Sequence, residues 1–193
     1  MLRLRTAFPA LCLTVLLAAC QPDSQNDFIA AASLPQPVTA IRTERAATIT
    51  PETRYGSRAL KNALPGYELE GVQIAVEDRT LWTLAAFHNG EQMLQILKGD
   101  DGAVSAVHGV SQRVAGPNGE QIGMTFVESG LRRSECRVGR NLWRGMAVCQ
   151  ARNAQNVKLV FSVPGYEGPF DQIPEPAQLR TATLQRIVWT PEN

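Results

Sequence analysis

Residues 157–163 read Val-Lys-Leu-Val-Phe-Ser-Val, and this stretch decides the fold class. Its odd-numbered positions are all apolar, while Lys158 and Ser162 stand between them. A period of two places alternate side chains on opposite faces of a β-strand. We therefore expect a strand with one face in a hydrophobic core.

Further strand-like stretches precede this one and are separated by turn sequences. Asn89-Gly90 is a strong hairpin signal. Gly99-Asp-Asp-Gly102 and Gly116-Pro-Asn-Gly119 mark two more turns. Strands joined by such short turns favour an antiparallel meander. The expected strands are 69–76, 80–87, 92–97 and 103–110, and a last element ends in 184–189.

Helical signals are few and short. Ser57 is the expected N-cap of a helix over Arg58–Leu64, which Pro65-Gly66 ends. The stretch Gln121–Ser129 is compatible with a strand or a short helix, and we favour the helix. We therefore predict an α+β fold, mainly an antiparallel β-sheet with one or two short helices and a disulfide-stapled hairpin.

The N-terminus has the pattern of a targeting segment. Arg3 and Arg5 precede an apolar run of twelve residues, Phe8–Ala19. Such a run suits an export signal and is too short for a membrane span. It ends in Leu-Ala-Ala-Cys20, which resembles the lipobox of bacterial lipoproteins. The alternatives are an uncleaved anchor and ordinary secretion.

The lipobox resemblance implies a particular processing and location. Residues 1–19 would be a cleaved signal peptide, and Cys20 would carry lipid, including palmitate. The next residue is Gln21 rather than the Asp that keeps lipoproteins at the inner membrane. The resemblance thus implies anchoring in the outer membrane, with the domain facing the periplasm. Residues 20–37 are polar or proline-broken and are expected to be a flexible tether, followed by one β-rich domain over 38–193.

The cysteines fit the same location. Cys12 would leave with the signal peptide and Cys20 would be lipidated, so Cys136 and Cys149 remain. An oxidising compartment favours a disulfide between them. They bracket Gly139-Arg140-Asn141, so the bond is expected to staple a hairpin.

Composition excludes several functional classes. The chain has 193 residues, 44% hydrophobic and 19% charged, with a formal net charge of +1. These values indicate one globular domain and no affinity for nucleic acid. The nucleotide-binding motifs are absent, and two histidines with four scattered cysteines do not form a structural zinc module. We expect no metal and no cofactor.

A set of short motifs resembles one family. The motifs are Leu64-Pro-Gly-Tyr67, Gly116-Pro-Asn-Gly119 with Ile122-Gly123, the Cys136/Cys149 pair, Val160-Phe161, Gly168-Pro169, Pro174 and Ile187-Val-Trp-Thr-Pro191. With the lipobox, these motifs are similar to the envelope-stress (sigma-E) regulated lipoproteins of Gram-negative bacteria, whose globular part is a domain of unknown function. The resemblance implies a compact β-rich α+β domain and transfers no catalytic residue.

Charge is unevenly distributed along the chain. Residues 66–101 contain seven acidic and two basic residues, and residues 113–158 contain eight basic and three acidic ones. An arginine-bearing hairpin could bind phosphates of lipopolysaccharide, or carboxylates of peptidoglycan or of a periplasmic protein. The alternative is a solvated surface partly paired with the acidic segment. The candidate anion-binding residues are Arg132, Arg133, Arg137, Arg140 and Arg144.

Catalytic candidates are weak. His88 and His108 lack a clear acid–base partner, and Ser57 with Lys61 is better explained by helix capping than as a dyad. We therefore predict a non-enzymatic envelope lipoprotein that binds or buffers a periplasmic partner. The alternatives are a lipid or small-molecule carrier, which needs a cavity of roughly 300 Å³ or more, and a cell-wall or lipid hydrolase.

Overall fold

The computed structural model describes residues 34–192. The predicted signal peptide, Cys20 and most of the predicted tether lie outside the described residues. Within the part that is described, no helix is both long enough and apolar enough to span a membrane.

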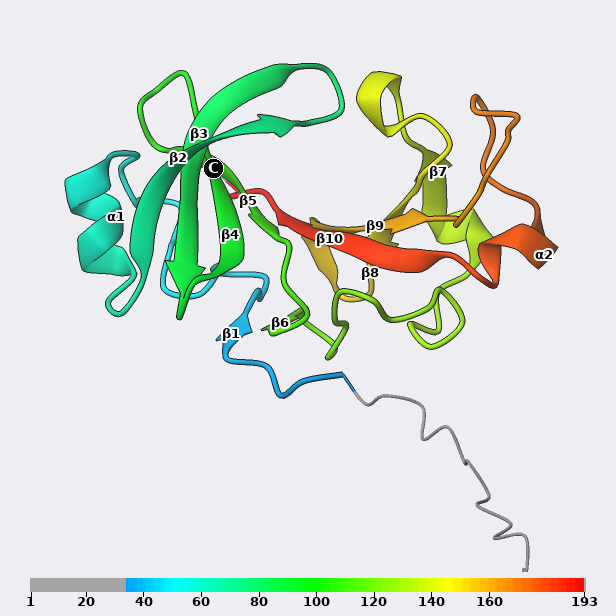
Figure 1. Cartoon of the computed structure of the whole chain (residues 1–193), viewed down its shortest axis with the longest axis horizontal. Helices are drawn as coiled ribbons and strands as arrows, with labels where there is room; N and C mark the ends of the chain where they lie inside the picture. The colour runs from blue at the N-terminus through cyan, green and yellow to red at the C-terminus, as the bar shows by residue number, and fades with distance from the viewer. Residues whose placement is uncertain (1–33, 193) are drawn as a thin grey trace, which may run out of the picture. The chain divides into compact units, whose positions relative to one another are not determined.

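One antiparallel sheet of eight strands dominates the domain (Figure 1). Its strand order is β2-β3-β4-β5-β10-β9-β8-β7. The predicted α+β class is therefore confirmed. The strands are β2 (Glu68–Ala75), β3 (Thr80–His88), β4 (Glu91–Lys98), β5 (Val104–Gly109), β7 (Cys136–Val138), β8 (Ala147–Ala151), β9 (Ala154–Ser162) and β10 (Thr183–Trp189).

The sheet consists of two locally connected groups joined by one strand. β2 to β5 form the predicted meander, and β7 to β9 form a second one. β10 lies between them, because Val188 is opposite His108 of β5 on one side and Lys158 of β9 on the other. The last strand in the described part of the chain is thus central in the sheet.

The main core covers one face of this sheet. Strand side chains such as Leu159, Ile187 and Trp189 are fully buried there. They pack against the N-terminal segment and α1 (Ser57–Ala63), through residues such as Ile49 and Leu60. The remaining elements are β1 (Thr39–Ala40), which pairs in parallel with β6 (Val114–Ala115), the 3-10 turns η1 (Arg133–Glu135) and η2 (Asn141–Trp143), and α2 (Pro176–Leu179).

Two helix predictions are corrected. α1 begins at Ser57 itself, and Gly56 occupies the N-cap position without a side-chain cap. The stretch Gln121–Ser129 forms turns and two isolated β-bridges rather than a helix. Its backbone is bound to the segment that leads into and begins β10: the N–H of Gly123 donates to the carbonyl of Leu184, and the N–H of Leu184 donates to that of Met124. Tertiary pairing thus uses the groups that a helix would need.

The predicted disulfide is confirmed. Cys136 and Cys149 are directly opposite each other in the β7–β8 hairpin and are bonded with an S–S distance of 2.04 Å. The connection is longer than the predicted three-residue turn, because residues 139–146, including η2, separate the two strands. Gly139 is required here, since a Cβ at this position would lie 2.2 Å from the carbonyl oxygen of Trp143.

Candidate functional site

The sheet face opposite the main core carries a row of side chains in register. The row crosses four adjacent strands, and each of its residues is directly opposite the next: Gln95 of β4, His108 of β5, Val188 of β10 and Lys158 of β9. Alternation explains the row, because the neighbours of Val188 in β10, Ile187 and Trp189, belong to the main core on the other face. A smaller apolar cluster lies on the same face as the row: Trp143, Val148, Val160 and Val188, with Val76 and Met146 packed against it.

The two edges of the sheet approach each other above this row. β2 and β7 are the edge strands, yet the loop that follows β2 contacts β7 and the loop after it. The N–H of Leu142 donates to the backbone carbonyl of Glu77 at 3.1 Å. The side-chain amide of Asn141 donates to Asp78 Oδ1, also at 3.1 Å. The sheet is therefore curled into a half-barrel.

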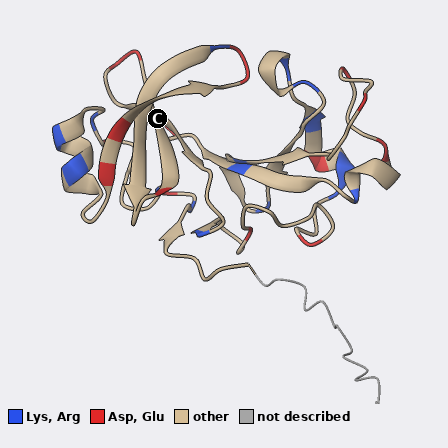
Figure 2. Cartoon of the chain, viewed as in Figure 1, with Lys and Arg blue, Asp and Glu red and all other residues tan. Residues whose placement is uncertain are grey.

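Glu77 is the centre of this closure. Its carboxylate accepts hydrogen bonds from both terminal nitrogens of Arg137, at 2.7 Å from Nη2, and from the backbone N–H of Arg140 at 2.7 Å. The Arg137 hydrogen bond holds the pKa of Glu77 below its ordinary value, against the opposing effect of burial. Figure 2 shows acidic positions at the β2–β3 tip and basic positions on the loop between β7 and β8.

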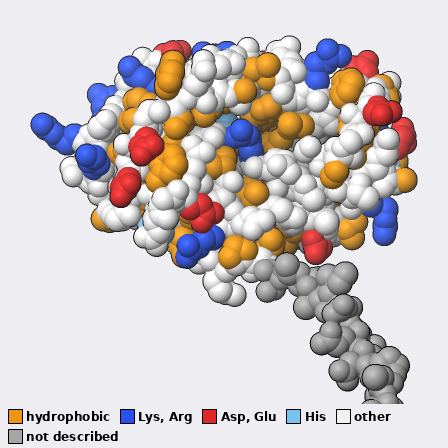
Figure 3. All heavy atoms as spheres, in the orientation of Figure 1, with side chains coloured by type: hydrophobic (Ala, Val, Ile, Leu, Met, Phe, Trp, Pro, Cys, Tyr) orange, Lys and Arg blue, Asp and Glu red, His pale blue; other side chains and the backbone are white. Residues whose placement is uncertain are grey.

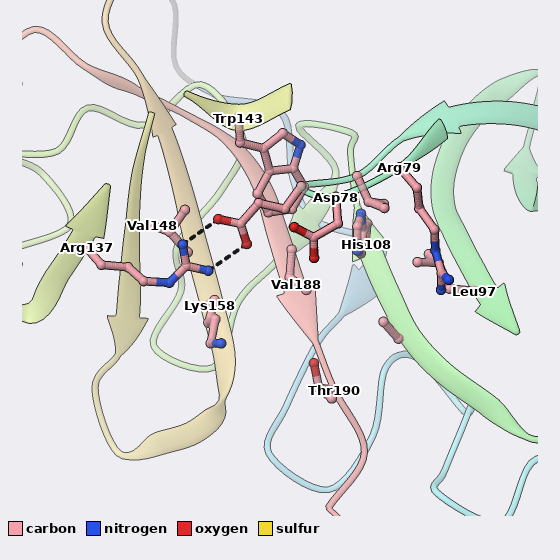
Figure 4. Close-up of a pocket in the computed structure, with 13 residues that line it drawn as sticks. Asp78, Arg79, Leu97, His108, Arg137, Trp143, Val148, Lys158, Val188 and Thr190 are labelled. Atoms are coloured by element: carbon pink, nitrogen blue, oxygen red, sulfur yellow. Dashed lines mark hydrogen bonds and ion pairs between the residues drawn. The ribbon is translucent and has the colours of Figure 1, made fainter. Parts of the chain in front are cut away.

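Between the row and this closure lies a cavity of about 460 Å³, which we call the central cleft. Figure 3 shows hydrophobic side chains gathered on this face of the domain, and Figure 4 shows the residues that line the cleft. Its volume is within the range of small-molecule sites. The apolar lining consists of Val76, Leu97, Ala106, Trp143, Val148 and Val188.

His108 lines the cleft and is almost completely buried, with 3% of its surface exposed. Nδ1 is shut off from solvent and has no hydrogen-bond partner among residues 34–192. Burial, together with the charge of Arg186, lowers the pKa of His108 to about 3. The ring is therefore neutral, and it lies with its centroid 5.9 Å from that of Trp143. Leaving a buried polar group unpaired costs about 1–3 kcal/mol.

Charged side chains border the cleft unequally. Arg79, Arg137 and Lys158 line it, as do Glu77 and Asp78. The three ion pairs between described residues join Arg132 to Glu135, and Arg137 and Arg140 to Glu77. Neither Arg79 nor Lys158 takes part in any of them. Both carboxylates, in contrast, are engaged by the β7–β8 loop, through the Glu77 and Asp78 contacts given above. The two free cations therefore leave the cleft with a positive character.

The structure does not bring the five predicted arginines together as one group. Arg132 and Arg133 precede β7, whereas Arg140 and Arg144 follow it. Arg132 pairs with Glu135 at 3.3 Å, and Arg133 donates to backbone carbonyls of Ile173 and Pro174. Arg140 lies 3.7 Å from Glu77, and Arg144 is exposed without an ion pair in the described region. Anion binding by this set stays a prediction.

The other candidate residues have local structural contacts. His88 Nδ1 lies 3.2 Å from the carbonyl of Gly66, and its ring packs near Tyr67. Ser57 and Lys61 are both exposed on α1. Tyr166 and Phe170 pack edge to face, next to Gly145 of the β7–β8 loop. No group of three or more His, Cys, Asp or Glu residues suited to a metal ion occurs in the described part of the chain.

Sequence reasoning missed the principal residues of the cleft: Glu77, Arg79, Trp143 and Lys158. Lys158 had a usable signal, because its alternation with core residues placed it on the second face of β9. The opposite charges of residues 66–101 and 113–158 anticipated pairing between these segments, and Glu77 with Arg137 is such a pair.

Comparison with known proteins finds one matching family and a solved structure with a similar fold. Residues 36–191 match the family described as "Protein of unknown function (DUF1131)". A crystal structure of the uncharacterized protein yfeY from Escherichia coli has a similar fold, with a TM-score of 0.64 and 20% sequence identity over 79% of this chain and 99% of that one. No curated protein matches the chain in sequence.

Proposed function

The chain belongs to the DUF1131 family of proteins of unknown function, and from this premise we propose that it is a non-catalytic binding protein of the bacterial cell envelope, with the central cleft as its binding site. The observation that carries the proposal is His108. A buried imidazole without a partner lies at a cleft of about 460 Å³. A polar group of a ligand in the cleft would lie against this ring and give it a hydrogen-bond partner.

Two alternatives from the sequence differ in how they use this cleft. The cleft favours a lipid or small molecule over a macromolecular partner, because its volume suits the former and its mouth is bordered by two loops. A hydrolase needs an acid–base group that titrates near the working pH. His108 has a pKa of about 3, so it supports hydrogen bonding to a ligand rather than proton transfer.

The envelope location is supported by the lipobox and the disulfide. We propose that Cys20 is lipidated, that the anchor lies in the outer membrane, and that the domain works in the periplasm during envelope stress. The Cys136–Cys149 bond is consistent with an oxidising compartment. Labelling with palmitate and membrane fractionation test this part. A Cys20→Ser variant should lose label and membrane retention, whereas Cys12→Ser should keep both; retention by Cys20→Ser would contradict the anchor.

Binding in the cleft is tested with the uncharged fluorophore N-phenyl-1-naphthylamine. Its fluorescence should rise on addition of the wild-type domain, because the apolar cleft removes it from water. Ala106→Trp fills the cleft and should abolish the rise. Ala75→Trp is the matched control, because Ala75 is exposed and does not line the cleft. Equal signals from both variants, or no signal from the wild type, would refute the proposed site.

A further inference from the structure

The central cleft has the shape of a site for an apolar chain. Apolar side chains line it from the floor strands and from the loops on both sides: Leu97 and Val188 from the sheet, Val76 from the β2–β3 hairpin and Trp143 from the β7–β8 loop. Their contact surface is continuous with the small cluster of Trp143, Val148 and Val188. An apolar segment of a ligand would extend this cluster into the cleft.

The charges around the cleft favour an anion. Three basic residues line it against two acidic ones, a net charge of +1 (3 − 2). Glu77 is neutralised by Arg137, and Asp78 accepts a hydrogen bond from Asn141, so both carboxylates are directed to the β7–β8 loop. Arg79 and Lys158 have no ion-pair partner in residues 34–192. They are available to a negatively charged group.

Strand register places the ring of His108 two strands away from one of these cations, Lys158. Val188 lies directly between His108 and Lys158 in neighbouring strands. Strands are about 4.8 Å apart, so a headgroup above Val188 would be within reach of both side chains. An uncharged imidazole can donate an N–H to a carboxylate or phosphate oxygen. The chemistry of the pair is thus complementary to an acidic headgroup.

We propose that the central cleft binds a single-chain amphiphile with an anionic headgroup, which hydrogen-bonds to His108 and lies beside Lys158 while its chain packs between Trp143 and Leu97. This inference rests on the proposed function, because it names the ligand class for the same cleft. It goes beyond that function by assigning selectivity: charge on the headgroup, not only apolar area, decides what binds.

Displacement of N-phenyl-1-naphthylamine from the full domain by three twelve-carbon amphiphiles tests the selectivity. Dodecanoate, dodecanol and dodecyltrimethylammonium share the chain and differ in headgroup charge, and all are used below their micelle concentrations. Dodecanoate should displace the probe at a concentration at least about tenfold lower than dodecanol, which corresponds to ~1.4 kcal/mol. Acetate, which has the headgroup without the chain, should not displace it. The advantage of dodecanoate should shrink as salt rises.

Two variants assign the selectivity to residues. Lys158→Gln should remove most of the preference for dodecanoate while leaving dodecanol unchanged, because the Lys158 side chain is exposed and unpaired. Lys61→Gln, on α1 away from the cleft, is the control. His108→Phe should weaken dodecanoate binding by about tenfold, as expected for one hydrogen bond to a charged group.

The outcomes separate this inference from the proposed function. Equal displacement by dodecanoate and dodecanol, or stronger displacement by dodecyltrimethylammonium, would overturn the anionic selectivity and leave the cleft as a binding site. A preference that survives Lys158→Gln at full strength would remove Lys158 from the headgroup site. Absence of probe binding to the wild type would instead refute the proposed function itself.

Discussion

Replacing Glu77 with alanine removes the carboxylate that joins the two edges of the curled sheet. Three hydrogen bonds to Arg137 and Arg140 are lost at once. The backbone bond from Leu142 to the Glu77 carbonyl can remain, because it does not involve the side chain. We therefore expect a less stable domain whose β7–β8 loop is held by fewer contacts.

The magnitude follows from how far this carboxylate is buried. The side chain of Glu77 is 13% exposed and that of Arg137 is 42% exposed. A buried charge-assisted bond contributes about 1.5–3 kcal/mol, but exposed pairs contribute only about 0.2–1 kcal/mol. We assign the Glu77–Arg137 pair a value near the upper end of the range for exposed pairs, because Arg137 is half-exposed. With the hydrogen bond from the Arg140 N–H added, the loss in unfolding free energy is about 2–3 kcal/mol. For a domain of this size that corresponds to a melting temperature lower by about 5–10 °C.

The pH dependence of this loss has a definite sign. The pKa of Glu77 is lowered in the folded state, so its stabilising effect is complete above the ordinary carboxyl pKa of 4.5. It disappears as the pH falls through the lower folded-state value. The difference in unfolding free energy between wild type and Glu77→Ala should therefore be constant from pH 8 to 5 and should shrink at more acidic pH.

Urea denaturation followed by tryptophan fluorescence measures this difference. Glu70→Ala is the matched control, because Glu70 is exposed on β2 and takes no part in the ion pairs of the described residues. Glu77→Gln should have an intermediate stability, since the amide oxygen still accepts one hydrogen bond. The reasoning is refuted if Glu77→Ala and Glu70→Ala unfold at the same urea concentration.

Three further predictions concern single features of the domain. Replacing Cys136 and Cys149 with serine should cost about 3 kcal/mol of stability in the chain-entropy model, measured by urea unfolding; an unchanged midpoint would contradict a structural role. The pKa of His108 falls to about 3 on folding, so the unfolded chain binds a proton at a higher pH than the folded protein does. The free energy of unfolding should therefore drop by up to ~1.4 kcal/mol per pH unit as the pH falls from 6.5. His108→Leu should flatten this slope between pH 6.5 and 4.5, and identical slopes for variant and wild type would rule the explanation out. Arg137→Glu should lower the melting temperature by several degrees through like-charge repulsion, whereas Arg144→Glu, at an exposed position without an ion pair, should not change it.

Local sequence patterns predicted the strands correctly. They failed where the backbone groups of a segment form hydrogen bonds to a segment far away in the chain. The alternation in residues 157–163 and the Asn89-Gly90 turn led directly to β9 and to the β3–β4 hairpin. Asn89 and Gly90 both adopt positive φ, as the predicted turn requires. The Gln121–Ser129 prediction failed because pairing with the segment around Leu184 replaced local hydrogen bonds. No short-range signal contains that information.

The site was harder to predict than the fold, because it depends on contacts between distant residues. Glu77 and Arg137 are 60 positions apart, and only the insertion of β10 between β5 and β9 brings the two halves into one curved sheet. The predicted strand 103–110 contains both Ala106 and His108, which alternation puts on one face, and both line the cleft. The sequence alone did not show which residues line the other side of the cleft, across from β5. The opposite net charges of residues 66–101 and 113–158 indicated attraction between these segments, but they did not indicate which residues pair.

The central position of β10 has a consequence for how the protein is made. β2 to β5 and β7 to β9 can each form as soon as their own residues are available, since their pairings join neighbours in the chain. The sheet that unites them needs Thr183–Trp189, which are synthesised after the other strands found in residues 34–192. During synthesis the nascent chain therefore remains incompletely folded until these residues have left the ribosome.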